Sequence, residues 1–208
     1  AVDKSNVWIK YATGTPSEGA EVSLMLYENS WNSVDQIPAR AVRARQISPY
    51  STIDPSGGGD SHRYSISGQQ RWANDNKHFL ISAYSIDYGL NLWSNFTYFT
   101  KPEGDQFLQV DERRIYGLDA EWTSSDTLFE RPTATTLGLK WQFDDIDALG
   151  LFNTQARQVL DVVREDAVQE SSVALFWQSA WQLSNRLRSL SGLRYERFHF
   201  ELSARDAA

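Results

Sequence analysis

Hydrophobic and polar residues alternate along much of this chain, most clearly over 77–92 and 110–123. The first segment carries apolar residues at every second position, namely Tyr84, Ile86, Tyr88, Leu90 and Leu92. The second segment repeats the pattern with Tyr116, Leu118, Ala120 and Trp122. Because successive side chains of a β-strand point to opposite faces, each segment predicts a strand with one apolar and one polar face. Repeated along a chain with aromatic residues near the segment ends, this pattern is typical of a barrel wall between lipid and water.

The pattern predicts about eight strands joined by short polar turns and by longer loops. The predicted strands are 6–13, 20–31, 61–73, 77–93, 109–123, 133–147, 164–181 and 186–202. The short connections are mostly rich in Gly, Pro, Asn, Asp and Ser, which favour tight turns. The long connections are expected at 32–60, 93–108 and 148–163. Within the first of them, Pro38 predicts a short helix near 38–46, because proline fits the first turn of a helix.

One segment, 155–181, carries a mixed signal. Ala156, Val159 and Val163 lie near helical spacing among Gln, Glu and Arg residues, which favour helices. The alternation of Val173 and Leu175 with their neighbours favours a strand in the second half of the segment. On local propensity alone, a helix and a strand are equally favoured here.

The amino-acid composition narrows the classes of protein to which this chain can belong. The chain has 208 residues with 8 Trp, 9 Tyr and 10 Phe, and 41% of its residues are hydrophobic. No stretch approaches the roughly 18 consecutive apolar residues of a membrane-spanning helix, whereas barrel strands need apolar residues only at alternate positions. The net charge of −7 argues against nucleic acid as a partner. The absence of cysteine excludes disulfides and thiolate metal sites.

The order of the connections predicts where the chain ends lie. Short turns alternate with long loops, so both ends are expected on the long-loop side of the wall. A complete outer-membrane barrel with an even number of strands normally keeps its ends beside its short turns. The sequence therefore predicts an open or incomplete wall that is an internal part of a larger barrel.

A family resemblance rests on several stretches spread along the chain. Among them are Trp31-Asn32-Ser33-Val34-Asp35-Gln36-Ile37-Pro38, Ala83-Tyr84-Ser85-Ile86-Asp87-Tyr88 and Gly192-Leu193-Arg194-Tyr195-Glu196. Together they resemble the barrel of TonB-dependent outer-membrane receptors, and the resemblance covers nearly the whole chain. It implies an all-β fold in which residues 1–208 supply about eight strands of an antiparallel, up-and-down, 22-stranded transmembrane barrel. The plug domain and the remaining strands of such a receptor are missing from this sequence.

The resemblance also implies a function. Such receptors lie in the bacterial outer membrane, contact its lipid, and actively import a scarce nutrient such as siderophore-bound iron, cobalamin or a similar chelate. They receive energy from the TonB complex through the plug, and the resemblance implies neither an enzyme activity nor a cofactor. Two alternatives stay open: a small eight-stranded outer-membrane barrel with a structural or adhesive role, and a soluble all-β carbohydrate-active domain.

Arg40, Arg43 and Arg45 form a basic patch in the first long loop. A cluster of this kind is suited to attract an anionic chelate at the mouth of a barrel. Arginines in an exposed loop are more often solvated, or paired with carboxylates such as Asp35 and Asp54. The sequence therefore leaves a ligand role and a purely structural role open for this patch.

Polar strand positions are expected to line the lumen, because the interior of such a barrel is polar. Asp87, Asp119, Glu121 and Arg194 are candidates, with ordinary wall structure as the default for each. Tryptophans near strand ends are expected to face lipid or its interface, namely Trp72, Trp93, Trp122, Trp141 and Trp177. Asp144, Asp145 and Asp147 lack the Gly and distal Glu of a calcium loop, so they predict a solvated rim rather than a metal site. No catalytic residue is predicted.

Overall fold

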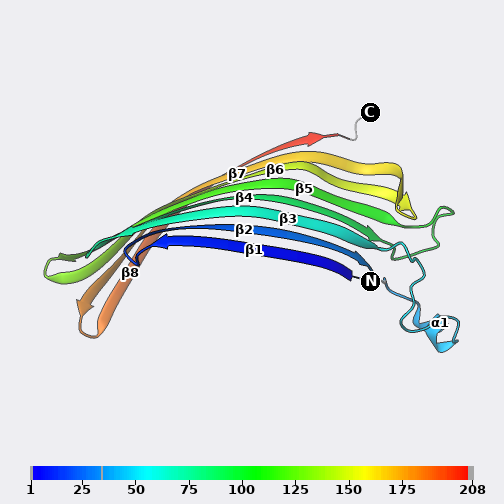
Figure 1. Cartoon of the computed structure of the whole chain (residues 1–208), viewed down its shortest axis with the longest axis horizontal. Coiled ribbons are helices and arrows are strands. Elements are labelled where there is room, and N and C mark those ends of the chain that lie inside the picture. The colour runs from blue at the N-terminus through cyan, green and yellow to red at the C-terminus, as the bar shows by residue number, and fades with distance from the viewer. Residues whose placement is uncertain (1, 34, 206–208) are drawn as a thin grey trace.

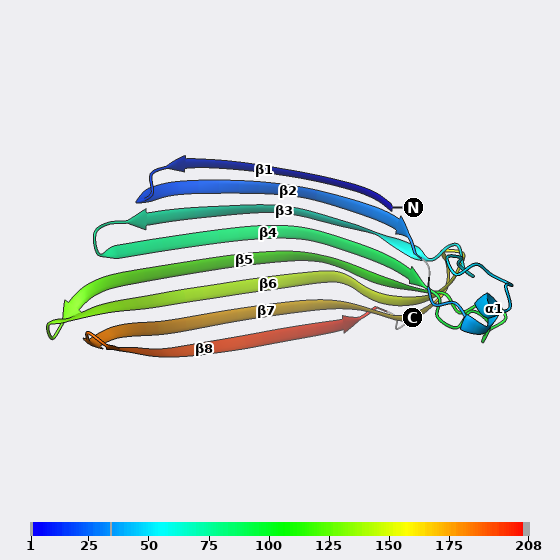
Figure 2. The ribbon, with the colours of Figure 1, turned by 90° about the horizontal axis from the view of Figure 1, so that it is seen from below.

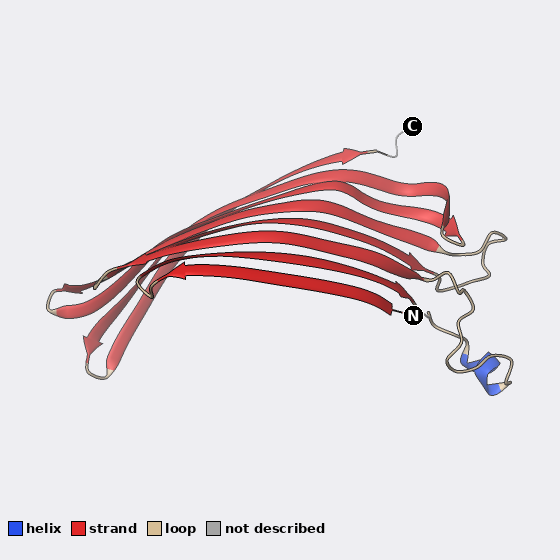
Figure 3. Ribbon diagram, in the orientation of Figure 1, coloured by secondary structure: helices blue, strands red, loops and turns tan. Residues whose placement is uncertain are grey.

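The computed structural model describes residues 2–33 and 35–205, and they form one sheet with a single short helix (Figures 1 and 3). The strands are β1 (Val2–Gly14), β2 (Glu18–Asn32), β3 (Gly58–Ala73), β4 (Lys77–Ser94), β5 (Phe107–Leu128), β6 (Arg131–Gln155), β7 (Gln158–Ser184) and β8 (Leu187–Ala204). The helix α1 (Ala39–Arg43) follows Pro38. The predicted strand count and the predicted short helix are both confirmed. Among the described residues, no helical segment has the length and hydropathy of a membrane-spanning helix.

Each strand pairs antiparallel with its neighbours in the sequence, in the order β1 to β8. Among the described residues, β1 pairs with β2 alone and β8 pairs with β7 alone, so the sheet does not close on itself. The predicted open, up-and-down wall is confirmed, and the alternative of a small closed eight-stranded barrel is wrong. The free ends of β1 and β8 lie at the same end of the sheet as α1, as the order of connections predicts (Figure 2).

The central strands are much longer than a bilayer requires. β5, β6 and β7 contain 22, 25 and 27 residues, whereas a transmembrane strand needs about 9–11. The long connection predicted at 148–163 is wrong, because β6 and β7 continue to a tight turn at Ala156 and Arg157. Both of these residues have positive φ angles, 50° and 68°, as a type I′ hairpin turn requires. The helix alternative for 155–181 is also wrong, since ladder pairing on both sides of β7 overrides its local propensity.

The register of β4 and β5 separates the two apolar stripes that the sequence shows. Tyr84 lies opposite Gly117, whereas Tyr116 lies opposite Ser85. Residues directly opposite each other in an antiparallel pair share a face. The stripe from Tyr84 to Leu92 therefore lies on one face of the sheet and the stripe from Tyr116 to Trp122 on the other.

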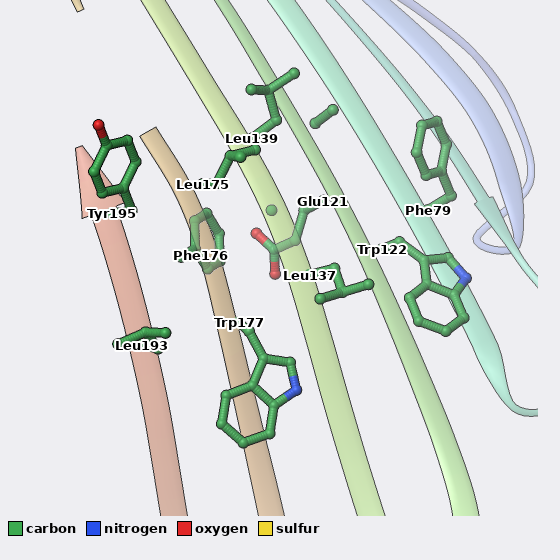
Figure 4. Close-up of a pocket in the computed structure, with 12 residues that line it drawn as sticks. Phe79, Glu121, Trp122, Leu137, Leu139, Leu175, Phe176, Trp177, Leu193 and Tyr195 are labelled. Carbon is green, nitrogen blue, oxygen red and sulfur yellow. The ribbon is translucent and has the colours of Figure 1, made fainter. Parts of the chain in front are cut away.

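A broad apolar band covers the turn-end half of the face that carries Tyr116 and Trp122. We term this the band face, and the other the opposite face. The pairing of neighbouring strands puts these exposed side chains on it: Val7, Ile9, Tyr11, Val22, Leu26, Ile66, Trp72, Tyr116, Leu137, Trp141, Val173, Leu175, Trp177, Leu193 and Tyr195. Figure 4 shows the part of the band between β4 and β8. Towards the loops the same face becomes polar, with Glu28, Asp60 and Asp87. An exposed apolar band on one side of a wall is the surface that a lipid bilayer requires.

On the opposite face, two aromatic rings lie over glycines of the neighbouring strand. A Cβ atom added to Gly117 would lie 2.2 Å from the Tyr84 ring, and one added to Gly138 would lie 1.9 Å from the Phe176 ring. Because glycine has no side chain, each of these positions leaves room for the neighbouring ring to lie close to the sheet.

Candidate functional site

Two adjoining hollows lie on the opposite face, near the loop end of the sheet. Their volumes are about 500 Å³ and about 570 Å³, and Gln109 and Leu151 line both of them. The first is lined mainly by Leu90, Asp111, Leu149, Arg164, Asp166 and Leu202, and the second by Phe96, Thr97, Thr100, Lys101, Asp105, Phe107, Asn153 and Val163. We term the two together the loop-end groove. Each hollow has the size of a small-molecule site, typically about 300–1,000 Å³.

A β-bulge brings the leucines of β6 into this groove. Arg113 of β5 lies opposite Ile146, but the preceding Glu112 lies opposite Ala148, so Asp147 is an extra residue in β6. An extra residue reverses the faces of all side chains beyond it. Leu149 therefore lies opposite Asp111 on the opposite face; without the bulge it would have pointed to the band face.

The charged residues of the first hollow lie in close pairs. Arg113 holds Asp111 through two hydrogen bonds, from Nε to Oδ1 at 2.7 Å and from Nη2 to Oδ2 at 2.6 Å. Arg164 likewise donates from Nε to Asp166, a carboxylate that is only 5% exposed. Bidentate and charge-assisted hydrogen bonds of this kind fix the geometry of both partners. These side chains therefore form a rigid, locally neutral part of the groove.

A buried polar network lies at the loop end of the sheet, with Gln106 at its centre. The Gln106 side chain is 3% exposed, and its Nε2 donates to Asp54 Oδ2 at 2.9 Å and to Ser56 Oγ at 2.7 Å. Its Oε1 accepts from Thr154 Oγ1 at 2.9 Å and from the Arg157 backbone N–H at 2.8 Å. One amide thus joins the β2–β3 loop, the β4–β5 loop and the β6–β7 turn. We term Asp54, Ser56, Asn95, Gln106, Thr154 and Arg157 the loop clasp.

Asp54 is the anionic centre of the loop clasp. Besides Gln106, it accepts hydrogen bonds from the backbone N–H of Ser56 at 2.9 Å and from Asn95 Nδ2 at 2.9 Å. Burial by itself would raise the pKa of the Asp54 carboxyl, but the hydrogen bonds from Ser56, Asn95 and Gln106 together lower that pKa below its ordinary value. Asp54 therefore stays ionised and keeps its acceptors available at neutral pH.

Arg157 explains how the tight turn between β6 and β7 is held without glycine. Its Nε donates to the Ser56 carbonyl at 2.8 Å, and its guanidinium lies 4.6 Å from the centre of the Trp93 ring. Positive φ angles are unfavourable for residues other than glycine, by about 1–2 kcal/mol each. The contacts of Arg157 within the loop clasp offset this cost, a role that no local sequence pattern signals.

None of the three arginines of the basic patch lines either hollow of the groove. Arg40 and Arg43 belong to α1 and Arg45 follows it, and all three are exposed. The predicted alternative of pairing with Asp35 or Asp54 is wrong for the described residues: Asp35 accepts the backbone N–H of Asn95 at 2.7 Å, and Asp54 is held by the clasp. The role of the patch in attracting a ligand stays a prediction.

The four predicted lumen residues do not share one face. Asp119, Glu121 and Arg194 lie on the opposite face, but Asp87 lies on the band face, above the apolar band. There Asp87 binds His62 at 2.9 Å. The four residues therefore cannot all line one lumen. Asp87 is separated from the other three because the apolar residues that flank it in β4, Ile86 and Tyr88, lie on the opposite face.

The register also decides which faces carry the predicted tryptophans and the acidic run of β6. All five tryptophans of the predicted lipid-facing set lie on the band face. The acidic run of β6 is divided, since Asp144 lies on the opposite face and Asp145 on the band face. Neighbouring carboxylates that point to opposite sides of a sheet cannot converge on one cation. Within the described ranges, no group of three or more His, Asp or Glu side chains is placed to hold a metal ion.

Comparison with known proteins gives consistent results. A family model for the TonB-dependent receptor-like β-barrel matches residues 10–207. The structure resembles the ferric citrate transporter FecA in its unliganded form, with a TM-score of 0.83 and 10% identity over 98% of this chain and 30% of that one. It also resembles the ferric-catecholate import receptor Fiu from E. coli K12 in an open form, with a TM-score of 0.70 and 10% identity over 98% of this chain and 38% of that one. At this identity the two structures show the fold alone. No curated protein matches the sequence.

Proposed function

Since this chain belongs to the family of TonB-dependent receptor β-barrels, we propose that it forms part of an outer-membrane receptor for the active uptake of a scarce nutrient. Proteins of this family are transporters rather than enzymes, and their barrels lie in the bacterial outer membrane. The observation that carries the proposal is the family match over 10–207 on a wall with an apolar band on one face and a groove on the other.

The band face is proposed to contact outer-membrane lipid. Its exposed apolar side chains gather at the turn end, and the polar residues of the same face begin toward the loops. Long strands above the band would then carry the loop-end groove outside the bilayer. Asp119, Glu121 and Arg194 would face the lumen, where the plug that receives energy from TonB is expected.

The wall is proposed to continue at both edges. The edge strands β1 and β8 each present one row of backbone groups without a neighbouring strand among the described residues. Each unsatisfied backbone group in hydrocarbon costs on the order of several kcal/mol. Further strands of a larger barrel would satisfy these groups, in keeping with the 30% and 38% of the two similar chains that this wall covers.

The proposed cargo is a ferric chelate or a similar small chelate. The similar structures are a ferric citrate transporter and a ferric-catecholate import receptor. The test is uptake of radiolabelled iron by the full-length receptor that contains this wall, produced in a Gram-negative strain without other chelate receptors. We expect uptake that stops when the proton gradient is collapsed or when TonB is deleted. Uptake that survives both treatments would show passive diffusion and contradict the proposal.

A further inference from the structure

We propose that a hollow in the apolar band binds one phospholipid of the periplasmic leaflet, selected by its ethanolamine headgroup. This inference rests on the proposed lipid contact of the band face, and it adds a defined site and a headgroup class. The hollow has a volume of about 540 Å³ and lies between β4 and β8 (Figure 4). We term it the band hollow.

The band hollow is a shaped depression in the band, made by strands of the interior of the sheet. The rings of Phe79 and Trp122 lie on one side of it and the ring of Trp177 on the other, with Leu137 and Leu139 between them (Figure 4). These residues belong to β4, β5, β6 and β7, each of which is paired on both sides. The hollow therefore does not result from an open edge of the sheet.

The side chains along these strands follow the order of groups in a phospholipid. Three successive rows across β5, β6 and β7 become more polar toward the turns. They are Ala120-Leu139-Leu175, Trp122-Leu137-Trp177 and Ser124-Thr135-Ser179. Tryptophan is favoured where the hydrocarbon of a bilayer meets its headgroups, so the first row lies at the level of acyl chains and the third at the level of headgroups. The short turns below them place this level in the periplasmic leaflet.

The acyl chain by itself cannot select one lipid. Lipid tails are as apolar as the side chains of the band, so no hydrophobic driving force favours one tail over another. The hollow supplies only a shape against which a chain packs. The choice among lipids must therefore come from contacts with the headgroup.

Two opposite charges lie at the headgroup level, beside the hydroxyl row. Lys77 is exposed and lies opposite Ser124 on the band face. Asp126 is two residues further along β5, and it accepts hydrogen bonds from Ser124 Oγ at 2.6 Å and from Asn76 Nδ2 at 3.4 Å. Because Asn76 directly precedes Lys77, this contact holds Lys77 and Asp126 at the same part of the rim. In the described part of the chain, no ion pair joins these two residues.

A headgroup with both a phosphate and a primary ammonium matches this pair of charges. The Lys77 ammonium would bind the phosphate, and the Asp126 carboxylate would accept hydrogen bonds from the ethanolamine nitrogen, since a primary ammonium carries three N–H donors. A glycerol headgroup offers no cation to Asp126. A choline headgroup offers a cation that has no N–H group to donate.

The experiment titrates the purified full-length receptor, in a mild detergent, with phospholipids that share their acyl chains and carry ethanolamine, glycerol or choline. Native mass spectrometry gives the dissociation constant of the first bound lipid. We expect the ethanolamine lipid to bind about fivefold more tightly than the other two, because one charge near a lipid surface changes association by about that factor. Equal affinities, or a preference for glycerol or choline, would overturn the inference.

The same spectra test a different occupant, and a separate assay tests the uptake function. A mass of two receptor copies without bound lipid would assign the hollow to a second copy and overturn the inference. Iron uptake is measured independently in cells. A receptor that imports iron but shows no headgroup preference would overturn this inference alone, whereas a receptor that shows the preference but no uptake would support it and contradict only the proposed function.

Two variants tie the lipid to the band hollow. Lys77→Gln should weaken binding of the ethanolamine lipid by about fivefold, and Ala120→Phe, which fills the hollow, should abolish the headgroup preference. The matched controls are Lys101→Gln at the loop end and Ala20→Phe, which makes the same change on β2 in the row of Ala120. Both controls should bind as the unaltered receptor does. Folding is checked by heat-modifiable migration on gels, and an unchanged preference in both folded variants of the hollow would contradict the assignment.

Discussion

The loop clasp makes a quantitative prediction for Gln106. Replacement by leucine keeps the size of the side chain but removes its four hydrogen bonds, which lie between 2.7 and 2.9 Å. Each such bond contributes about 0.5–1.5 kcal/mol net. Thr154, which is 1% exposed, would lose its side-chain partner, whereas Asp54 would keep its bonds from Ser56 and Asn95.

We therefore expect Gln106→Leu to weaken the closed state of the clasp by about 2–6 kcal/mol. A change of about 3 kcal/mol raises the population of the open state roughly 100-fold, since about 1.4 kcal/mol corresponds to a factor of ten. The strands below should stay paired, because their ladders do not involve this side chain. The effect is thus local to the three connections that the clasp joins.

The assay is amide hydrogen exchange of the full-length receptor in nanodiscs, followed on peptides that cover 50–58 and 152–159. The matched control is Gln109→Leu, the same substitution three residues further along at an exposed position. We expect faster exchange in both peptides for Gln106→Leu and no change for Gln109→Leu. Equal exchange in the two variants would refute the view that one buried amide holds these loops together.

Three further predictions concern the wall and the clasp. In urea unfolding of the receptor in lipid, Leu175→Arg should destabilise the protein by about 2–4 kcal/mol because it puts a charge on the apolar band. Gln178→Arg, on the opposite face of β7, should leave the stability nearly unchanged in the same assay. Gly138→Ala should lower the free energy of unfolding by about 1–3 kcal/mol, because the added Cβ would overlap the Phe176 ring. Gly68→Ala should lower it by less than about 1 kcal/mol, because the nearest atom to an added Cβ is 3.8 Å away. Equal losses of stability in thermal unfolding would contradict this. The pKa of Asp54 is lowered from its ordinary value of 3.8. Ionised Asp54 should therefore stabilise the clasp fully above pH 3.8, and this stabilisation should be lost as the pH falls through the lowered pKa of the folded state. The measurement is the rate at which pepsin cleaves the loops, which should rise at the acid end of a pH series.

Both the strand count and the open wall follow from the sequence because they depend on local signals. Alternation with a period of two marks each strand, and Gly, Pro, Asn and Asp mark the turns between them. The antiparallel order of sequence neighbours then follows from the short connections. The same local signals fail at 148–163, where two strands continue past the expected loop to a turn made by Ala156 and Arg157, neither of them a typical turn residue.

The candidate site could be predicted only in small part. Leu90 belongs to a stripe that the sequence shows plainly, yet its position on the opposite face, beside the groove, comes from its pairing with Asp111. The clasp gathers residues from three separate connections, and nothing near Gln106 in the sequence marks it as buried. Ligand-facing and clasp residues of this kind are defined by long-range neighbours, which a pattern along one chain does not contain.

The alternation along the chain is enough to predict a wall of eight amphipathic strands, each with an apolar and a polar side. Which way each side faces depends on the pairing between strands, so it is seen only in the folded sheet. Because side chains alternate at every residue, a shift of one position in pairing turns a whole stripe over. The register of β4 turns Tyr84 to Leu92 away from the band, and the bulge at Asp147 turns Leu149 and Leu151 the same way. These two reversals bring Leu90, Leu149 and Leu151 together along the loop-end groove.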